Sequence, residues 1–276
     1  MALELRPLWT TEWIVCGFFA YLIVLSCVRP LPPGARRRVL LVSLVCIALA
    51  VMLAQLRPSP SLSILREWIP TVYLLQGYWL CGLFFRRPML GVERRLLAFD
   101  SWLIEGAGLG RLASRTPRLV ASWFELCYLL AYPFVPVGFG LFLALGQRGR
   151  ADTFWTAALL AAFACYGLLP WIQTRPPRSL AAQRPLLIPH LALRRLNGAV
   201  LQRMSVQVNT CPSGHAATAA AVALAVSSAG AAPAAAVFLG VAASIVAATV
   251  LGRYHYAIDS VLGLAIGIGA WWIAFS

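Results

Sequence analysis

The sequence predicts an all-α membrane protein, a polytopic bundle of about eight transmembrane helices with one or two interfacial helices. Of its 276 residues, 61% are hydrophobic and only 12% are charged, and the mean hydropathy is +0.78. Soluble domains are about 45–50% apolar and about 25% charged, so this composition excludes an ordinary soluble domain. Several uninterrupted apolar stretches also approach or exceed the roughly 20 residues that a helix needs to cross a bilayer.

Eight apolar stretches are expected to cross the membrane, with polar or proline-rich segments between them. Residues 29–38 carry arginines and prolines after the first stretch, which is typical of a stop-transfer signal. The Pro- and Ser-rich residues 57–66 are expected to form a loop, and Pro133 and Pro136 are expected to kink the fourth stretch. The expected spans comprise residues 13–28, 39–56, 67–85, 119–145, 153–172, 213–228, 231–251 and 258–275.

Two polar segments predict helices that lie at the membrane surface. Residues 86–118 mix arginines with Leu, Phe and Trp, which is typical of a helix in the headgroup layer. Residues 173–210 carry apolar side chains at roughly helical spacing between their arginines. The last three spans are rich in Ala, Gly and Ser, and Gly263 and Gly267 form a small-xxx-small pair. We therefore expect the last three helices to pack closely.

The charge balance is strongly basic, with a formal net charge of +14, and all 23 basic residues are arginines. Arginine stays charged and can bind two phosphate oxygens at once. Because the arginines are divided among short loops between apolar spans, they indicate anionic lipids or phosphorylated substrates rather than nucleic acid. The seven cysteines lie mostly in apolar stretches and form no C-x-x-C motif, so we expect neither disulfides nor a metal site.

Two of the three histidines fall at the ends of predicted spans. His215 lies in the P-S-G-H sequence that begins the sixth span, and His255 lies between the seventh and the eighth. Because successive spans cross in opposite directions, both histidines are expected on one membrane face. Arg175 and Arg178, which follow the fifth span, belong to the same face. Two imidazoles and several arginines should therefore meet there.

The residue types on this face fit phosphoryl chemistry. A Pro-Ser-Gly helix start offers free backbone N–H groups to an anion, while Ser213 adds a hydroxyl and Gly214 permits a close approach. Asp259 follows His255 by four residues, so on a continuous helix it can fix the tautomer of the imidazole. The second ring nitrogen of His255 is then free to attack, and His215 can protonate the leaving oxygen.

These motifs resemble the type 2 phosphatidic acid phosphatase (PAP2) superfamily over roughly residues 70–270. The P-S-G-H motif is complete, and His255 and Asp259 match the H-x-x-x-D that ends the family's third motif. The residues around His255 look most like the inositol phosphorylceramide synthase-like branch. Two positions depart from the family pattern. Leu168 stands where the family's first motif has a lysine, and Thr249 stands where its third motif has an arginine.

The resemblance implies an integral-membrane enzyme that cleaves a lipid phosphate or diphosphate through a phosphohistidine. In this scheme His255 is the nucleophile, Asp259 orients it and His215 is the general acid. No metal or other cofactor is required. An N-terminal transmembrane hairpin, 1–66, would precede a PAP2-like catalytic bundle, 67–276. The implied ligands of the phosphoryl oxygens are Arg175, Arg178, Arg253, Ser213 and Gly214.

Two alternatives stay open. A head-group transferase of the inositol phosphorylceramide synthase type would use the same intermediate and pass it to an alcohol instead of water. A non-enzymatic lipid-binding membrane protein with a decayed site would account for the missing lysine and arginine. The expected partners are membrane lipids and a lipid phosphate or polyprenyl diphosphate substrate, and the sequence leaves the oligomeric state open.

Two further residues and the orientation complete the expectations. Glu125, inside the fourth span, is either functional or a structural partner of an arginine or of a tyrosine such as Tyr128 or Tyr132. His190 is expected to make only interface contacts. Most arginines fall on the face with the histidines, which by the positive-inside rule indicates the cytoplasm. The resemblance instead implies the outer face of the cell membrane, and we favour that orientation.

Overall fold

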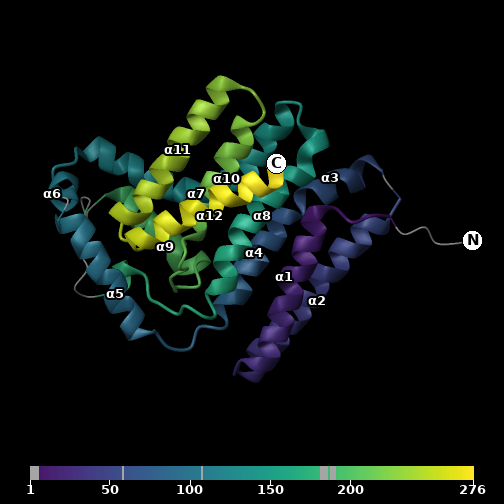
Figure 1. Ribbon diagram of the computed structural model, residues 1–276, viewed down its shortest axis with the longest axis horizontal. Coiled ribbons are helices and arrows are strands. Elements are labelled where there is room, and N and C mark those ends of the chain that lie inside the picture. Colours follow the sequence, from purple (N-terminus) through teal and green to yellow (C-terminus); the bar gives the residue numbers. More distant parts are fainter. Residues whose placement is uncertain (1–5, 58, 107, 181–185, 187–190) are drawn as a thin grey trace, which may run out of the picture.

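The computed structural model describes residues 6–57, 59–106, 108–180, 186 and 191–276. The described chain consists of helices joined by turns and loops, with one isolated backbone bridge, so the all-α class is confirmed (Figure 1). The α-helices are α1 (Thr10–Val28), α2 (Pro33–Gln55), α3 (Pro60–Trp68), α4 (Pro70–Gly82), α5 (Leu90–Ser101), α6 (Leu109–Ser114), α7 (Arg118–Ala144), α8 (Ala151–Leu168), α9 (Ala192–Met204), α10 (Gly214–Ser227), α11 (Ala232–Leu251) and α12 (Ala257–Phe275).

Six described helices are long and apolar enough to cross a membrane. They are α1, α2, α7, α11, α12 and the segment Arg148–Leu168, which contains α8. The predicted membrane-type bundle is therefore confirmed, but the count of about eight spans is not. The other two expected spans form shorter helices, because α4 has 13 residues and α10 has 14.

The third expected span is short because the chain begins a separate helix before it. Ser59 caps α3, its side chain accepting a hydrogen bond from the Leu62 N–H at 3.3 Å, and Pro60 occupies the first turn. Serine at the N-cap and proline in the first turn both favour a helix start. The predicted loop over residues 57–66 is therefore wrong from Pro60 onward. A second proline, Pro70, begins α4.

Helices also form in both segments that we expected at the membrane surface. Residues 86–118 contain α5 and α6, and residues 173–210 contain α9. In Figure 1, α5 and α6 lie at the edge of the molecule opposite the α1–α2 pair. Their position at a membrane surface stays a prediction. In α7 the chain remains helical through Pro133 and Pro136.

The connections between the long helices gather at two ends of the bundle. The start of α8 lies beside the start of α1, where the Asp152 carboxylate accepts hydrogen bonds from the N–H groups of Thr10 and Thr11, both at 2.9 Å. With 18 residues, α8 is about 27 Å long, so its two ends are well separated. We call the end with Asp152 the far end, and the end with His215 and His255 the histidine end.

Close packing of α12 on α10 fixes the histidine end. A Cβ atom added to Gly263 would collide with the carbonyl oxygen of Ser213, and one added to Gly267 would collide with that of Ala217. Only glycine allows a backbone to approach another so closely. The close packing predicted for this small-xxx-small pair is therefore confirmed. It brings the start of α12 to the residues that precede His215.

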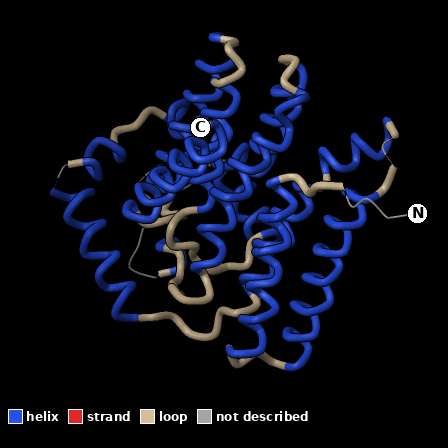
Figure 2. The backbone as a smooth tube through the Cα atoms, turned by 45° about the vertical axis from the view of Figure 1, so that its right-hand side comes forward, coloured by secondary structure: helices blue, strands red, loops and turns tan. Residues whose placement is uncertain are grey.

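The N-terminal pair α1 and α2 packs on one side of the bundle (Figures 1 and 2). Helix α1 contacts both α4 and α8, and the rings of Phe18 and Phe163 stack with their centroids 3.9 Å apart. The α1–α2 pair thus shares an apolar core with the remaining helices. The division of the chain into residues 1–66 and 67–276 stays a prediction.

Candidate active site

The first histidine, His215, lies in the first turn of α10. Ser213 caps this helix, its hydroxyl accepting a hydrogen bond from the Ala216 N–H at 3.3 Å. The Ser213 N–H donates to the backbone carbonyl of Asp259 at 2.9 Å. The cap satisfies one of the free N–H groups at the helix start. The second bond ties this start to α12, so the residues before His215 are held from both directions.

The second histidine, His255, lies in the tight turn between α11 and α12. Arg253 adopts a left-handed φ of 58°, and the N–H groups of Tyr254 and His255 both donate to the Thr249 carbonyl at 2.9 Å. A positive φ is uncommon for residues with a side chain, and it persists where surrounding contacts determine the backbone. The turn sends the chain back into the bundle and places His255 opposite α10.

The two imidazoles lie beside each other, as the alternation of spans predicts. The ring centroids of His215 and His255 are 5.9 Å apart, and the ring planes are nearly perpendicular at 80°. Between His255 Nδ1 and Asp259 Oδ2 the distance is 3.8 Å, longer than a hydrogen bond. Asp259 Oδ2 instead accepts hydrogen bonds from Asn209 Nδ2 at 2.7 Å and from the Tyr256 N–H at 3.2 Å. The sequence analysis did not single out Asn209.

Of the three arginines expected to bind phosphate, Arg178 lines a cavity that both histidines also line. Its backbone N–H donates to the Arg253 carbonyl at 2.9 Å, and its Nη1 donates to the Tyr254 carbonyl at 3.3 Å. Within the described part of the chain, no carboxylate forms an ion pair with Arg178. Its positive charge is therefore available at the cavity wall.

The other two arginines bind carboxylates of α5. Arg175 Nη2 lies 2.8 Å from Glu93 Oε2, and Arg253 Nη1 lies 3.0 Å from Asp100 Oδ2. The same carboxylates also accept backbone hydrogen bonds at 2.8 Å, Glu93 from the Arg175 N–H and Asp100 from the Ala257 N–H. Neither arginine lines the cavity. In this structure both serve to attach α5 to the segments that carry the site.

The two α5 carboxylates differ in their electrostatics. The hydrogen bond from the Arg175 side chain lowers the pKa of Glu93, because it stabilises the ionised carboxylate. Burial raises the pKa of Asp100, although the Ala257 N–H and Arg253 oppose that rise. The Glu93 contact is therefore an ion pair at neutral pH.

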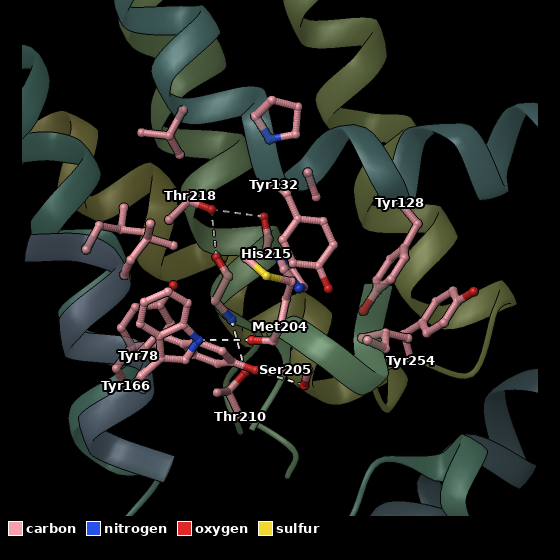
Figure 3. A pocket seen from close by; sticks show the side chains of 18 of the residues that line it. Tyr78, Tyr128, Tyr132, Tyr166, Met204, Ser205, Thr210, His215, Thr218 and Tyr254 are labelled. Atoms are coloured by element: carbon pink, nitrogen blue, oxygen red, sulfur yellow. Dashed lines mark hydrogen bonds between the residues drawn. The ribbon is translucent and has the colours of Figure 1, made fainter. Parts of the chain in front are cut away.

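A cavity of about 380 Å³ adjoins both histidines. Figure 3 shows His215 among the side chains that line it. Helices α4, α7 and α9 supply walls that are mainly apolar and aromatic. The rings of Tyr132 and Tyr128 lie edge-on to His215, with centroids 5.4 and 5.5 Å away. Gly214 and Arg178 line the cavity near the same ring. A cavity of this kind suits a ligand with a long apolar part and an anionic head group.

Glu125 lies behind this wall and is fully paired. Its Oε1 accepts a hydrogen bond from Arg194 Nη1 at 2.8 Å, and its Oε2 accepts from Asn197 Nδ2 at 2.7 Å and from the Tyr254 hydroxyl at 2.6 Å. Of the two alternatives left open for Glu125, the structure shows the pairing with an arginine, and the tyrosine that also binds the carboxylate is Tyr254 and not Tyr128 or Tyr132.

One residue singled out in the sequence, His190, lies outside the described residues, so its expected interface contacts are not tested. Within the described ranges, no group of three or more His, Cys, Asp and Glu side chains is arranged to hold a metal ion. The partners of Arg175 and Arg253 had no signal in the sequence, because Glu93 and Asp100 lie more than 80 residues earlier in the chain.

The fold and the site together define a class of protein, a multi-helix membrane protein with a two-histidine pocket at one end of its bundle. The comparison with known families matches residues 94–273 to the PAP2 superfamily. The chain therefore belongs to the PAP2 superfamily, which generally comprises phosphatases and phosphotransferases. Searches among curated proteins and among solved structures gave no match.

Proposed function

We propose that this protein is an integral-membrane lipid phosphatase or phosphotransferase that forms a phosphohistidine on His255. The observation that carries the proposal is the pair of imidazoles, 5.9 Å apart, at the wall of a largely apolar cavity of about 380 Å³. An anionic head group beside the histidines and an apolar tail in the cavity describe a lipid phosphate or a polyprenyl diphosphate. Arg178, which forms no ion pair with a carboxylate of the described residues, would hold the phosphoryl oxygens.

The proposed reaction has two steps. His255 Nε2 attacks phosphorus, an N–P bond forms, and the bond to the lipid oxygen breaks while His215 gives that oxygen a proton. In the second step water attacks the phosphohistidine, the N–P bond breaks, and His215 takes the proton that water loses. Asp259, on the Nδ1 side of His255, would stabilise the positive imidazole of the intermediate.

The other residues expected to bind the phosphoryl oxygens differ in how well their positions suit that role. Ser213 and Gly214 lie at the start of α10, where the helix dipole favours an anion, but the Ser213 N–H already donates to the Asp259 carbonyl and the Gly214 N–H to Thr210 Oγ1 at 3.4 Å. Arg175 and Arg253 would reach a phosphate only by sharing their charge with Glu93 and Asp100. We therefore propose that these two arginines act mainly by fixing the site segments.

A head-group transferase of the inositol phosphorylceramide synthase type is the second candidate. It is favoured by the hydroxyl groups in the cavity, among them Tyr78 OH and Ser205 Oγ, which lie 3.0 Å apart. Such groups would bind the hydroxyls of an alcohol acceptor. The first step would be unchanged, and the alcohol oxygen would replace water in the second.

For the membrane arrangement we propose eight crossings, with α4 and α10 added to the six long helices. Both connect the two ends of the bundle, and α10 is short because other helices, not lipid, surround most of its surface. We also propose a cell-membrane location, with the histidine end on the outer face and residues 1–66 as an N-terminal hairpin.

The decisive assay measures phosphate release by the purified protein in detergent, with a chelator present. The panel contains a phosphatidic acid and a polyprenyl diphosphate, each with and without inositol or glycerol. Release that needs no alcohol identifies a phosphatase, and head-group transfer to inositol or glycerol identifies a transferase. Vanadate, which mimics five-coordinate phosphorus, should inhibit both. Absence of turnover under all these conditions would favour the non-enzymatic lipid-binding alternative.

A further inference from the structure

A buried carboxylate on α7 holds the residue that precedes His255. Glu125 is 1% exposed and does not line the cavity, so it cannot touch a substrate there. Its Oε2 accepts a hydrogen bond of 2.6 Å from the hydroxyl of Tyr254. A short bond to an ionised acceptor is stronger than a neutral one. Burial and then the charge of Glu125 raise the pKa of Tyr254, so its hydroxyl keeps the proton that it donates.

The ring of Tyr254 is held on its faces as well as at its hydroxyl. It stacks on Tyr128, with centroids 3.6 Å apart and planes 9° from parallel; Figure 3 shows both rings at the cavity. The guanidinium carbons of Arg194 and Arg178 lie 5.5 and 5.7 Å from the ring centroid, within the range of cation–π attraction. Arg178 also donates a hydrogen bond to the Tyr254 carbonyl. Tyr254 therefore contacts Arg178 directly, and it is the chain neighbour of His255.

The same carboxylate connects the turn to α9. Arg194 Nη1 binds Glu125 Oε1 at 2.8 Å, and Arg194 Nη2 binds the Gly252 carbonyl at 3.1 Å. Asn197 Nδ2 binds both Glu125 Oε2 and the Glu125 carbonyl. Helix α9 also supplies Leu201 and Met204 to the cavity wall. One carboxylate thus joins three elements, α7, α9 and the turn that carries His255.

The imidazole needs such support because its nearest carboxylate is not hydrogen-bonded to it. His255 Nδ1 and Asp259 Oδ2 are 3.8 Å apart, and among the described residues Nδ1 has no hydrogen-bond partner. Besides the backbone bonds to Thr249 and the Arg253–Asp100 ion pair, the contacts of Tyr254 and Arg194 fix this turn.

We infer that Glu125 is a positioning residue, which holds Tyr254 and thereby sets the placement of His255 and Arg178 against the α9 wall of the cavity. The inference rests on the proposed function, because it assigns a role in that reaction. A small misplacement of reacting groups costs up to about 100-fold in rate, so loosening this turn should slow chemistry more than it weakens binding.

Two variants test the role, and a third is the matched control. Tyr254→Phe removes only the hydroxyl that Glu125 binds and keeps the ring stacked on Tyr128. Glu125→Gln removes the charge. Glu67→Gln removes the charge of another buried carboxylate, which binds Arg148 through both oxygens at the far end. We expect Tyr254→Phe and Glu125→Gln to lower kcat about 10- to 100-fold with KM changed less than threefold. Glu67→Gln should keep the wild-type kcat.

The readouts are steady-state kcat and KM, the single-turnover rate of phosphohistidine formation, and the melting temperature in detergent. Wild-type kcat in Tyr254→Phe would overturn the inference, as would equal losses in Glu125→Gln and Glu67→Gln. If Glu125→Gln does not fold, Tyr254→Phe decides alone. The proposed function fails separately, if His255→Ala is as active as the wild type. An inactive His255→Ala beside a fully active Tyr254→Phe would overturn only the role of Glu125.

Discussion

The two ends of the bundle use buried carboxylates in different ways. At the far end, Glu12 binds Arg66 through both oxygens at 2.7 and 2.8 Å, and Glu67 binds Arg148 likewise at 2.8 and 3.0 Å. Each pair joins two helices or a helix and a turn, and each buried carboxylate is matched by one cation.

At the histidine end, carboxylates are also paired with arginines, but Arg178 at the cavity wall and the fully buried Asp259 stay outside these pairs. Arg178 has no carboxylate partner among the described residues, and Asp259 is bound by an amide and a backbone N–H instead of an arginine. A buried charge without an opposite charge is costly, so it is retained where another group supplies the balance. The comparison teaches that matched pairs build both ends, while the fully buried carboxylate that has no arginine partner among the described residues, Asp259, lies beside the two histidines.

The largest effect should come from His255→Ala. We expect phosphate release from the best lipid substrate to fall by about 10³-fold or more, because the nucleophile is lost. The measurement is phosphate release per folded protein, with folding checked by the melting temperature. A variant as active as the wild type would remove the functional difference between the two ends.

The next largest effect separates two arginines that the comparison treats as different. Arg178→Gln should lower kcat/KM about 100-fold, because the charge that faces the cavity is removed. Arg148→Gln, which removes an arginine paired with Glu67 at the far end, should leave kcat/KM within twofold of the wild type. Equal losses in the two variants would mean that the unmatched charge has no special role.

A smaller effect should follow from Asp259→Asn. The substitution weakens support for the positive imidazole and disturbs the contact with Asn209, so we expect kcat to fall about tenfold. KM should change little, because Asp259 does not line the cavity. The kinetic constants over a lipid concentration series check this, and a rise in KM with unchanged kcat would contradict it.

The smallest effect concerns pH. Because Arg175 lowers the pKa of Glu93, their ion pair stabilises the fold fully above the ordinary carboxyl pKa of about 4.3. This stabilisation is lost as pH falls through the lowered pKa of the folded protein. Melting temperatures between pH 7 and pH 3 should therefore drop less steeply in Glu93→Gln than in the wild type. Parallel curves would show that the pair does not contribute.

Much of the architecture follows from local sequence patterns. Long apolar runs specify helices such as α11 and α12, and the P-S-G-H sequence specifies a capped helix start. The same prolines and serines were harder to interpret at residues 57–66, because Ser and Pro favour both loops and the first turn of a helix. The structure resolves that ambiguity for α3 through the Ser59 cap.

The arginine partners could not be predicted from local patterns. Arg175, Arg178 and Arg253 look alike in the sequence, and all three follow apolar segments. Only the fold brings Glu93 to the first and Asp100 to the last, leaving Arg178 at the cavity. The connection of Glu125 to Tyr254 likewise joins residues separated by 129 positions.

The glycine contact between α10 and α12 has a mechanical consequence. Gly263 rests on the main-chain oxygen of Ser213, so the gap between the two imidazoles is set by rigid backbone instead of by adaptable side chains. Outer helices such as α2 and α11, whose surfaces are largely exposed, can tilt when a bilayer thins or thickens. The catalytic spacing should then stay constant across lipids of different chain length, and a methyl group introduced by Gly263→Ala should abolish that tolerance.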